Sequence, residues 1–242
     1  MRKSAPLLLF LTVLLTGCGG GTNTTEKLFT LNVGAKWVYQ VSGSVAITGL
    51  TNNSIPLDST KSTLTITVDP ATVKDANAQD VNILDRKLDL FTRDGQEIKS
   101  NLRLYVKQAS NGIFVHGFNS YMGDTIDLTK NIFVPATAAP KFAFLYIPDP
   151  VSLAVPLSYA KPFDTAATGV YQVAISDVRS VVQVPAGSFL AKPFLMTEGF
   201  DQVNITNGAL VPEIGMISAT ISATLADKTI LNGALVLKSY TF

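Results

Sequence analysis

The stretch Ile217–Leu225, "ISATISATL", indicates most clearly which fold this chain adopts. Apolar residues at 217, 219, 221, 223 and 225 alternate with serine and threonine. Because successive side chains of a β-strand point to opposite faces, such a stretch places all its apolar residues on one face. The pattern is typical of an antiparallel strand with one buried face and one face in water.

The same period of two recurs along the chain, so the whole domain is predicted to be built from strands. In residues 37–48 (WVYQVSGSVAIT) the apolar residues again share one face. The other predicted strands are at Thr63–Val68, Leu102–Val106, Ile113–Val115 and Phe142–Tyr146. Residues 75–91 fit both periods, but Leu84, Leu88 and Leu90 favour a strand. We therefore expect an all-β, mainly antiparallel domain with little helix.

Turns are predicted where Asn or Asp precedes Gly, because these residues tolerate positive φ in tight hairpins. Four such pairs occur: Asp94-Gly95, Asn111-Gly112, Asn207-Gly208 and Asn232-Gly233. The pair at 111–112 is the strongest, since a predicted strand lies on each side. Six prolines in residues 135–163 predict a long connection that crosses one end of the sheet and packs through its aromatic residues.

Composition narrows the chemistry that the domain can carry. The chain has one cysteine, Cys18, which excludes an internal disulfide and a zinc site of several thiolates. Hydrophobic residues make up 47% and charged residues 15% of the chain, against about 25% charged in typical globular proteins. Serine, threonine, asparagine and glutamine must therefore supply much of the polar surface.

The charge balance argues against a nucleic-acid partner. The chain has 19 basic and 18 acidic residues, and loss of Arg2 and Lys3 with a leader would leave 17 against 18. Nucleic-acid-binding domains need clustered positive charge, which is missing here. The densest charged cluster, Asp85–Lys87 with Asp89, mixes both signs, and we expect it to form a solvated face.

The first 17 residues have the three zones of an export signal. Arg2 and Lys3 are followed by an apolar run of nine residues, Leu7–Leu15, and then by the small residues Thr16 and Gly17. Nine helical residues span only about 14 Å, which is too short for a bilayer core of about 30 Å. The segment is predicted to be a secretory signal peptide and not a membrane span.

Leu15-Thr16-Gly17-Cys18 resembles the lipobox of bacterial lipoproteins. The resemblance implies cleavage between Gly17 and Cys18, a diacylglycerol on the Cys18 sulfur and, usually, acylation of the new amino terminus. Two or more acyl chains anchor a protein stably to a membrane. Gly19 after the cysteine implies the outer membrane if the organism is Gram-negative, facing either the periplasm or the surface. Residues 18–27 would then be the lipidated cysteine with a flexible tether, and 28–242 a single β-rich domain.

Three further stretches together resemble a broad group of uncharacterised β-rich envelope lipoproteins. Leu28–Tyr39 (LFTLNVGAKWVY) is similar to their P-L-x-x-G-x-x-W-x-Y opening, although Thr30 stands where proline is frequent. Val184–Phe189 (VPAGSF) is similar to V-P-A-G-T-F, and Glu213–Ile217 (EIGMI) to G-V-G-x-V. The resemblance implies a single curved sheet or open half-barrel, as in lipoprotein carriers that enclose an apolar concavity. Turn chemistry explains the motif residues as corners of the fold better than as a site.

No catalytic or metal-binding constellation emerges from the sequence. His116 is the only histidine, and we expect it to be solvated or locally hydrogen-bonded. Ser188 lacks the nucleophile-elbow pattern, and Asp149 and Glu213 lie beside prolines in expected loops. We assign no catalytic residue, metal or cofactor, and the sequence supports a non-catalytic role better than an enzyme.

These observations leave three functional hypotheses. The first is a membrane-anchored envelope lipoprotein with a non-catalytic binding role, whose ligand is hydrophobic. The second is a structural or protein-interaction lipoprotein of an envelope assembly. The third and weakest is a hydrolase of envelope polymers. A ligand pocket of about 300–1,000 Å³ would favour the first, an outer apolar patch the second, and carboxylates around His116 in one cleft the third.

Overall fold

The computed structural model describes fifteen β-strands and one 3₁₀ helix, joined by turns and loops. The described residues are 31–46, 54–109, 112–137, 141–145, 151–157, 169–176, 178–197, 203–225 and 228–242. The elements are β1 (Lys36–Ala46), β2 (Ser54–Pro56), β3 (Thr63–Lys74), β4 (Asp80–Phe91), β5 (Glu97–Ala109), β6 (Gly112–Tyr121), η1 (Leu128–Lys130), β7 (Ile132–Phe133), β8 (Lys141–Leu145), β9 (Val151–Leu157), β10 (Gly169–Ile175), β11 (Ser180–Val184), β12 (Gly187–Thr197), β13 (Val203–Val211), β14 (Gly215–Thr224) and β15 (Ile230–Thr241).

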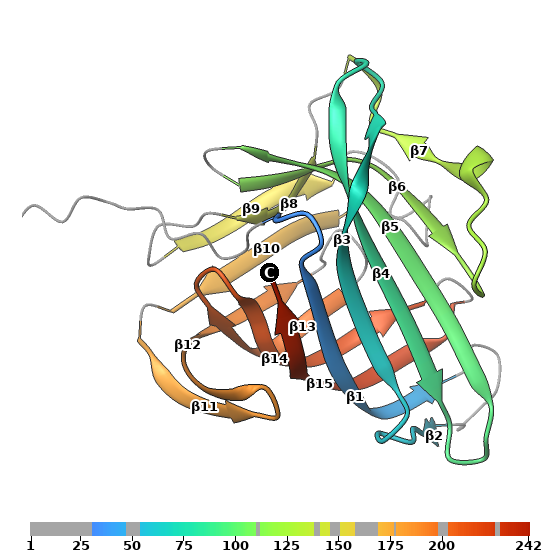
Figure 1. The fold of residues 1–242 in the computed structure, drawn as a ribbon. Coiled ribbons are helices and arrows are strands. Elements are labelled where there is room, and N and C mark those ends of the chain that lie inside the picture. The colour runs from blue at the N-terminus through green and yellow to red at the C-terminus, as the bar shows by residue number, and fades with distance from the viewer. Residues whose placement is uncertain are drawn as a thin grey trace, which may run out of the picture.

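The strands pair antiparallel into one sheet, with the order β7-β6-β5-β4-β3-β1-β15-β14-β13-β12-β10-β9. The short strands β2, β8 and β11 pair with β1, β6 and β12 outside this path. Pairings among the described strands do not join the two ends of the order, so the sheet is curved and open (Figure 1). The expected all-β, antiparallel class with little helix is confirmed.

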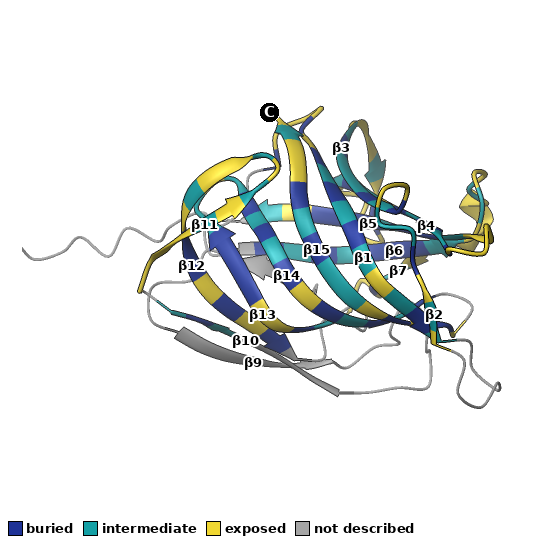
Figure 2. Ribbon diagram, turned by 90° about the horizontal axis from the view of Figure 1, so that it is seen from below, coloured by how far each residue is buried: buried dark blue, intermediate teal, exposed yellow. Residues whose placement is uncertain are grey.

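The period-2 pattern explains which face of the sheet is buried. In β14 the residues from Gly215 to Ala223 that share the parity of Ile217 are buried, and those between them are more exposed. The same alternation is visible along β15 and β1 in Figure 2. Most buried apolar residues of the long strands form one large cluster, and we call the face that carries it the inner face. The strand prediction from "ISATISATL" is therefore confirmed.

A second, much smaller apolar cluster lies on the opposite face of the sheet, which we call the outer face. It consists of Val81 and Ile83 of β4 and Tyr105 of β5, with Val73 and Phe133 packed against them. The Tyr105 and Phe133 rings stack with centroids 5.0 Å apart. The strands β4 and β5 therefore carry buried apolar residues on both faces of the sheet.

Two of the predicted hairpin turns are wrong, because their glycines serve close packing inside strands. Asn207-Gly208 lies within β13, where a Cβ on Gly208 would come within 2.1 Å of the Phe194 ring. Asn232-Gly233 lies within β15, where Gly233 pairs with Gly43 of β1. A Cβ on Gly233 would approach the Ser42 carbonyl oxygen to 2.0 Å, so only glycine lets these backbones meet.

In each of the turns on either side of β14, a residue other than glycine has positive φ. Glu213 has φ +68° between β13 and β14, and Lys228 has φ +67° between β14 and β15. Asp94-Gly95 does form the β4–β5 turn, with Gly95 at φ +91°. Asn111 lies outside the described residues. The sequence placed Glu213 beside Pro212 in an expected loop, whereas the turn at Lys228 was not predicted.

The expectation of a long connection over residues 135–163 is corrected by two strands within it. β8 pairs with β6, and β9 pairs with β10. Pro156 lies in β9 opposite Val170. As the last strand of the described order, β9 has only one neighbour, and such an edge position tolerates a proline. The strand prediction for residues 75–91 is confirmed over Asp80–Phe91.

Candidate functional site

A small cavity lies between two parts of the inner face that the curvature brings opposite each other. Its volume is about 60 Å³, and it is partly open to solvent. The lining comes from β3, β4 and β5 on one side and from β13, β14 and β15 on the other. The lining residues are Leu64, Arg86, Leu88, Ser100, Leu102, Val203, Ile221, Ala223, Thr224, Leu225, Leu231 and Leu235. Because β5 and β13 are separated by five strands in the sheet order, their meeting here shows how strongly the sheet is curved.

Strand alternation places Arg86 on the inner face. Its neighbours of the same parity in β4, Leu84 and Leu88, belong to the large apolar cluster. Across the sheet Arg86 pairs with Ile66 of β3 and Leu102 of β5. The expected solvated face at 85–89 is therefore wrong at Arg86, which points to the opposite face from Asp85 and Lys87. The signal was present in the sequence, since Arg86 has the parity of the leucines.

Burial sets the electrostatics of this arginine. It lowers the pKa of the Arg86 guanidinium to about 10, and the nearby Tyr39 phenol offsets part of that effect. Arg86 is therefore still protonated at neutral pH. Burial likewise raises the pKa of Tyr39, whose hydroxyl donates a hydrogen bond of 2.7 Å to the Met216 carbonyl. A charged guanidinium thus lines an otherwise mainly apolar cavity.

Ser100 is the second polar side chain on the β4–β5 side of the cavity. It pairs with Leu88, and Leu102 pairs with Arg86, so Ser100 is a diagonal neighbour of Arg86 on the inner face. Diagonal neighbours of this kind are within reach of a long side chain. Among the described residues that line the cavity, none is acidic. The site can therefore hold an apolar group beside a fixed positive charge, whereas it offers no nucleophile–base pair for covalent chemistry.

His116 lies away from this cavity, as an extra residue where the β5–β6 register shifts between Tyr105 and Val106. Its Nδ1 lies 2.8 Å from Asp75 Oδ2, and the Asp75 side chain is 2% exposed. Burial alone would raise the pKa of Asp75, but hydrogen bonds from Gln79, His116 and Asn77 outweigh burial and lower that pKa. His116 is hydrogen-bonded, as expected.

The remaining sequence candidates do not assemble into a site. Ser188 is exposed in β12, directly after the β11–β12 turn, and Glu213 is exposed in the β13–β14 turn. Asp149, Gly17 and Cys18 lie outside the described residues. In the described ranges no group of three or more His, Cys, Asp or Glu side chains could hold a metal ion. Among the described residues, Asp75 is the one carboxylate bonded to His116. The hydrolase hypothesis requires more than one carboxylate around His116 in one cleft.

Two of the three motif stretches meet in the fold, although 177 residues separate them. Trp37 Nε1 donates a hydrogen bond of 2.8 Å to the Ile214 carbonyl. Tyr39 donates to the carbonyl of Met216, as described above. Both aromatic side chains are almost completely buried in the large apolar cluster. The aromatic residues of β1 therefore fasten the β13–β14 corner to the inner face.

The third motif stretch contacts β15, the strand that pairs with β1. The Ala186 amide of the β11–β12 turn donates a hydrogen bond of 3.0 Å to the Leu237 carbonyl of β15. The Phe189 ring lies 6.2 Å from that of Tyr240, which pairs with Trp37. These contacts give the motif residues a structural role.

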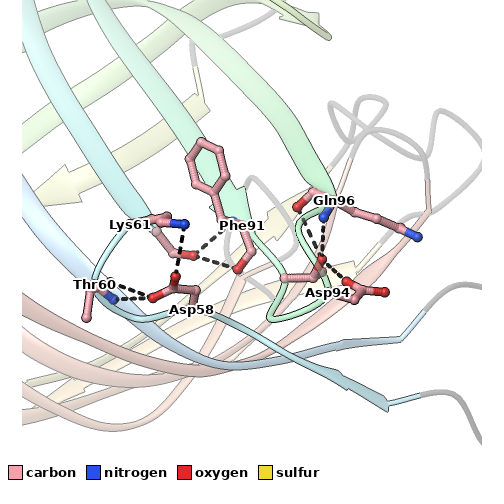
Figure 3. Close-up of polar contacts among 8 residues, drawn as sticks. Asp58, Thr60, Lys61, Phe91, Asp94 and Gln96 are labelled. Atoms are coloured by element: carbon pink, nitrogen blue, oxygen red, sulfur yellow. Dashed lines mark hydrogen bonds and ion pairs between the residues drawn. The ribbon is translucent and has the colours of Figure 1, made fainter.

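A polar cluster where β3 begins and β4 ends also has a structural role (Figure 3). Asp58 Oδ1 accepts hydrogen bonds from the Thr60 amide at 3.0 Å and the Thr60 hydroxyl at 2.6 Å. The fully buried Ser62 hydroxyl donates to the Phe91 carbonyl at 3.2 Å and accepts from the Phe91 amide at 2.9 Å. Thr92 bonds to Asp94 and Gln96 in the next turn. These bonds satisfy turn residues and tie the start of β3 to the end of β4.

The described part of the chain contains no helix that is long and apolar enough to cross a bilayer. Comparison of the chain with protein-family models, with curated proteins and with solved structures found no match. The functional argument therefore depends on the chain's own residues and geometry.

Proposed function

We propose that this chain is a membrane-anchored envelope lipoprotein that binds a hydrophobic ligand non-catalytically on the inner face of its curved sheet. The observation that carries the proposal is the mainly apolar cavity between β3–β5 and β13–β15. Its volume of about 60 Å³ is below the ~300–1,000 Å³ typical of pockets that enclose a whole drug-sized ligand. The cavity therefore suits a short segment of a ligand and not a whole phospholipid.

Trp37 allows binding to be measured without an added label. It is the only tryptophan in the chain, and it pairs with Ile66, which pairs with Arg86. Two strand spacings of 4.7–4.9 Å separate Trp37 from Arg86 along this row, which is about 10 Å. A brominated acyl chain in the cavity would quench Trp37, because bromine quenches indole fluorescence over a short range.

The test uses the purified full chain in phosphatidylcholine vesicles, titrated with methyl 9,10-dibromostearate. We expect saturable quenching in the native chain and weaker binding, by about fivefold or more, in Ala223→Met, which fills the cavity. One added side chain of this size costs about 1–3 kcal/mol in a packed site, which corresponds to roughly fivefold to 150-fold in affinity. Ala219→Met is the matched control, since Ala219 is a buried alanine of the same strand outside the cavity lining. Absence of saturable quenching, or equal quenching in both variants, would reject the ligand-binding function.

The anchor is tested separately through Cys18. We expect Cys18→Ser to lose the mass of the attached acyl chains and to keep its leader, because the lipobox cysteine would be missing. The measurement is the intact mass of the protein recovered from the membrane fraction. If Cys18→Ser has the native mature mass and still partitions with membranes, the lipoprotein assignment is wrong.

A structural or protein-interaction role is the second candidate, and an exposed apolar patch favours it. Val181 of β11 and Leu190 of β12 are paired, and they are 68% and 54% exposed. Val178, just before β11, is 69% exposed. Grouped exposed apolar side chains of this kind occur at protein interaction sites. If Ala223→Met binds the brominated ester normally while Val181→Ser with Leu190→Ser abolishes a detergent-stable envelope complex, this role replaces the first.

A further inference from the structure

We infer that the ligand of the inner-face cavity is a long-chain carboxylic acid whose carboxylate binds Arg86. This inference rests on the proposed ligand-binding function and specifies the chemical class of the ligand. A neutral hydrocarbon would need only the apolar wall, whereas the cavity also presents a positive charge.

The first argument is charge complementarity. Arg86 is the one charged side chain among the described residues that line the cavity. An ion in apolar surroundings loses hydration, and an opposite charge with hydrogen bonds compensates that loss. A carboxylate brings an opposite charge to the cavity wall that contains Arg86, which a neutral or cationic head group does not. The site therefore selects an anion.

The second argument is the geometry of the donors. A guanidinium has five N–H donors in a planar fork that matches the two oxygens of a carboxylate. Arg86 takes part in further interactions within the protein, and the five donors allow it to share them with a ligand. Ser100, the diagonal neighbour of Arg86, places a hydroxyl on the same cavity. A carboxylate at this point can therefore accept bonds from two residues of adjacent strands.

The third argument is the composition of the remaining wall. Leucine, isoleucine, valine and alanine make up most of it, and these side chains come from both sides of the curved sheet. The volume of about 60 Å³ is enough for a small head group and a short alkyl segment. A carboxylate with its first methylenes matches this combination better than a bulky phosphate-linked head group does.

The experiment compares 2-bromostearate with its methyl ester on the full chain in phosphatidylcholine vesicles, with Trp37 quenching as the readout. A bromine on C2 lies next to the carboxyl group and therefore enters the cavity with it. In the native chain we expect the acid to bind more tightly than the ester. Arg86→Met should weaken binding of the acid about tenfold to a hundredfold, which is the usual range for a hydrogen bond to a charged group. Binding of the ester should be unchanged, because Met keeps the apolar wall.

Two further variants keep the result interpretable. Arg86→Lys retains the charge and should recover a large part of the affinity for the acid, which a general loss of folding would not allow. Arg93→Met removes an exposed arginine from the β4–β5 turn and should bind both probes normally. If the native chain and Arg86→Met bind acid and ester equally, the carboxylate assignment is wrong while the ligand-binding function stands. If neither probe binds the native chain, the ligand-binding function itself fails.

Discussion

Arg86 and Arg103 lie on adjacent strands but on opposite faces of the sheet, and their surroundings differ. On the outer face, Arg103 donates to both carboxylate oxygens of Asp85, at 3.2 and 2.8 Å. The side chains of this pair are 17% and 12% exposed. Hydrogen bonding to Asp85 is the main cause that raises the pKa of Arg103. On the inner face, burial lowers the pKa of Arg86 to about 10.

The comparison separates a structural charge from a charge that can serve a ligand. Arg103 has a matched carboxylate directly opposite it in the β4–β5 register. Arg86 lies opposite two apolar residues, Ile66 and Leu102, and lines the cavity. Retaining a cation in apolar surroundings costs stability. An arginine that lines a cavity is therefore a better functional candidate than Arg103, whose charge is matched by Asp85.

The largest expected effect is the loss of stability when a buried apolar residue is truncated on one face or the other. Leu90→Ala removes a fully buried side chain from the large inner cluster, and Ile83→Ala truncates the small outer cluster. Such truncations cost about 2–5 kcal/mol, more where the site cannot collapse. We expect Leu90→Ala near the upper end and Ile83→Ala near the lower end, measured by urea unfolding of each variant. Equal losses would show that the outer cluster is as tightly packed as the inner one.

An intermediate effect is expected from the two arginine environments. Asp85→Asn leaves the partly buried Arg103 with only the more distant Asp69 carboxylate, at 3.8 Å, and should lower the free energy of unfolding by about 1–3 kcal/mol. Arg86→Met replaces a desolvated charge by an apolar side chain of similar length and should leave stability unchanged or raise it. Thermal unfolding of both variants at pH 7 checks the pair. A loss in Arg86→Met as large as that in Asp85→Asn would make Arg86 a structural residue.

The smallest expected effect concerns pH and the Asp75–His116 pair, which joins the β3–β4 turn to β6. The pKa of Asp75 in the folded protein is lowered from 3.8, so the unfolded chain takes up a proton first as the pH falls. The stabilisation by this carboxylate is thus present above about pH 4 and lost at lower pH as the folded-state pKa is passed. We expect Asp75→Asn to be less stable at pH 7 and to lose less stability than the native chain between pH 4 and pH 2. Parallel acid-unfolding curves for the two proteins would contradict this.

How much the sequence predicts depends on the physical origin of each feature. Alternation over residues 217–225 predicts a strand and its buried face, because one face of one strand decides both. The same parity rule would have placed Arg86 with Leu84 and Leu88 if it had been applied through the charged cluster. Gly208 and Gly233 could not be assigned, since their role depends on Phe194 and Ser42, which lie on other strands. The cavity was unpredictable for the same reason: its walls are joined only when the sheet curves.

The pairing of β1 with β15 has a consequence for how the chain acquires its structure. These two strands lie side by side in the middle of the sheet order, with Lys36 opposite Thr241. During synthesis β1 emerges before every other described strand and β15 after all of them. Contacts between residues so far apart in sequence form slowly, because a long loop must close first. The middle of the sheet can therefore not be completed until its last strand has left the ribosome.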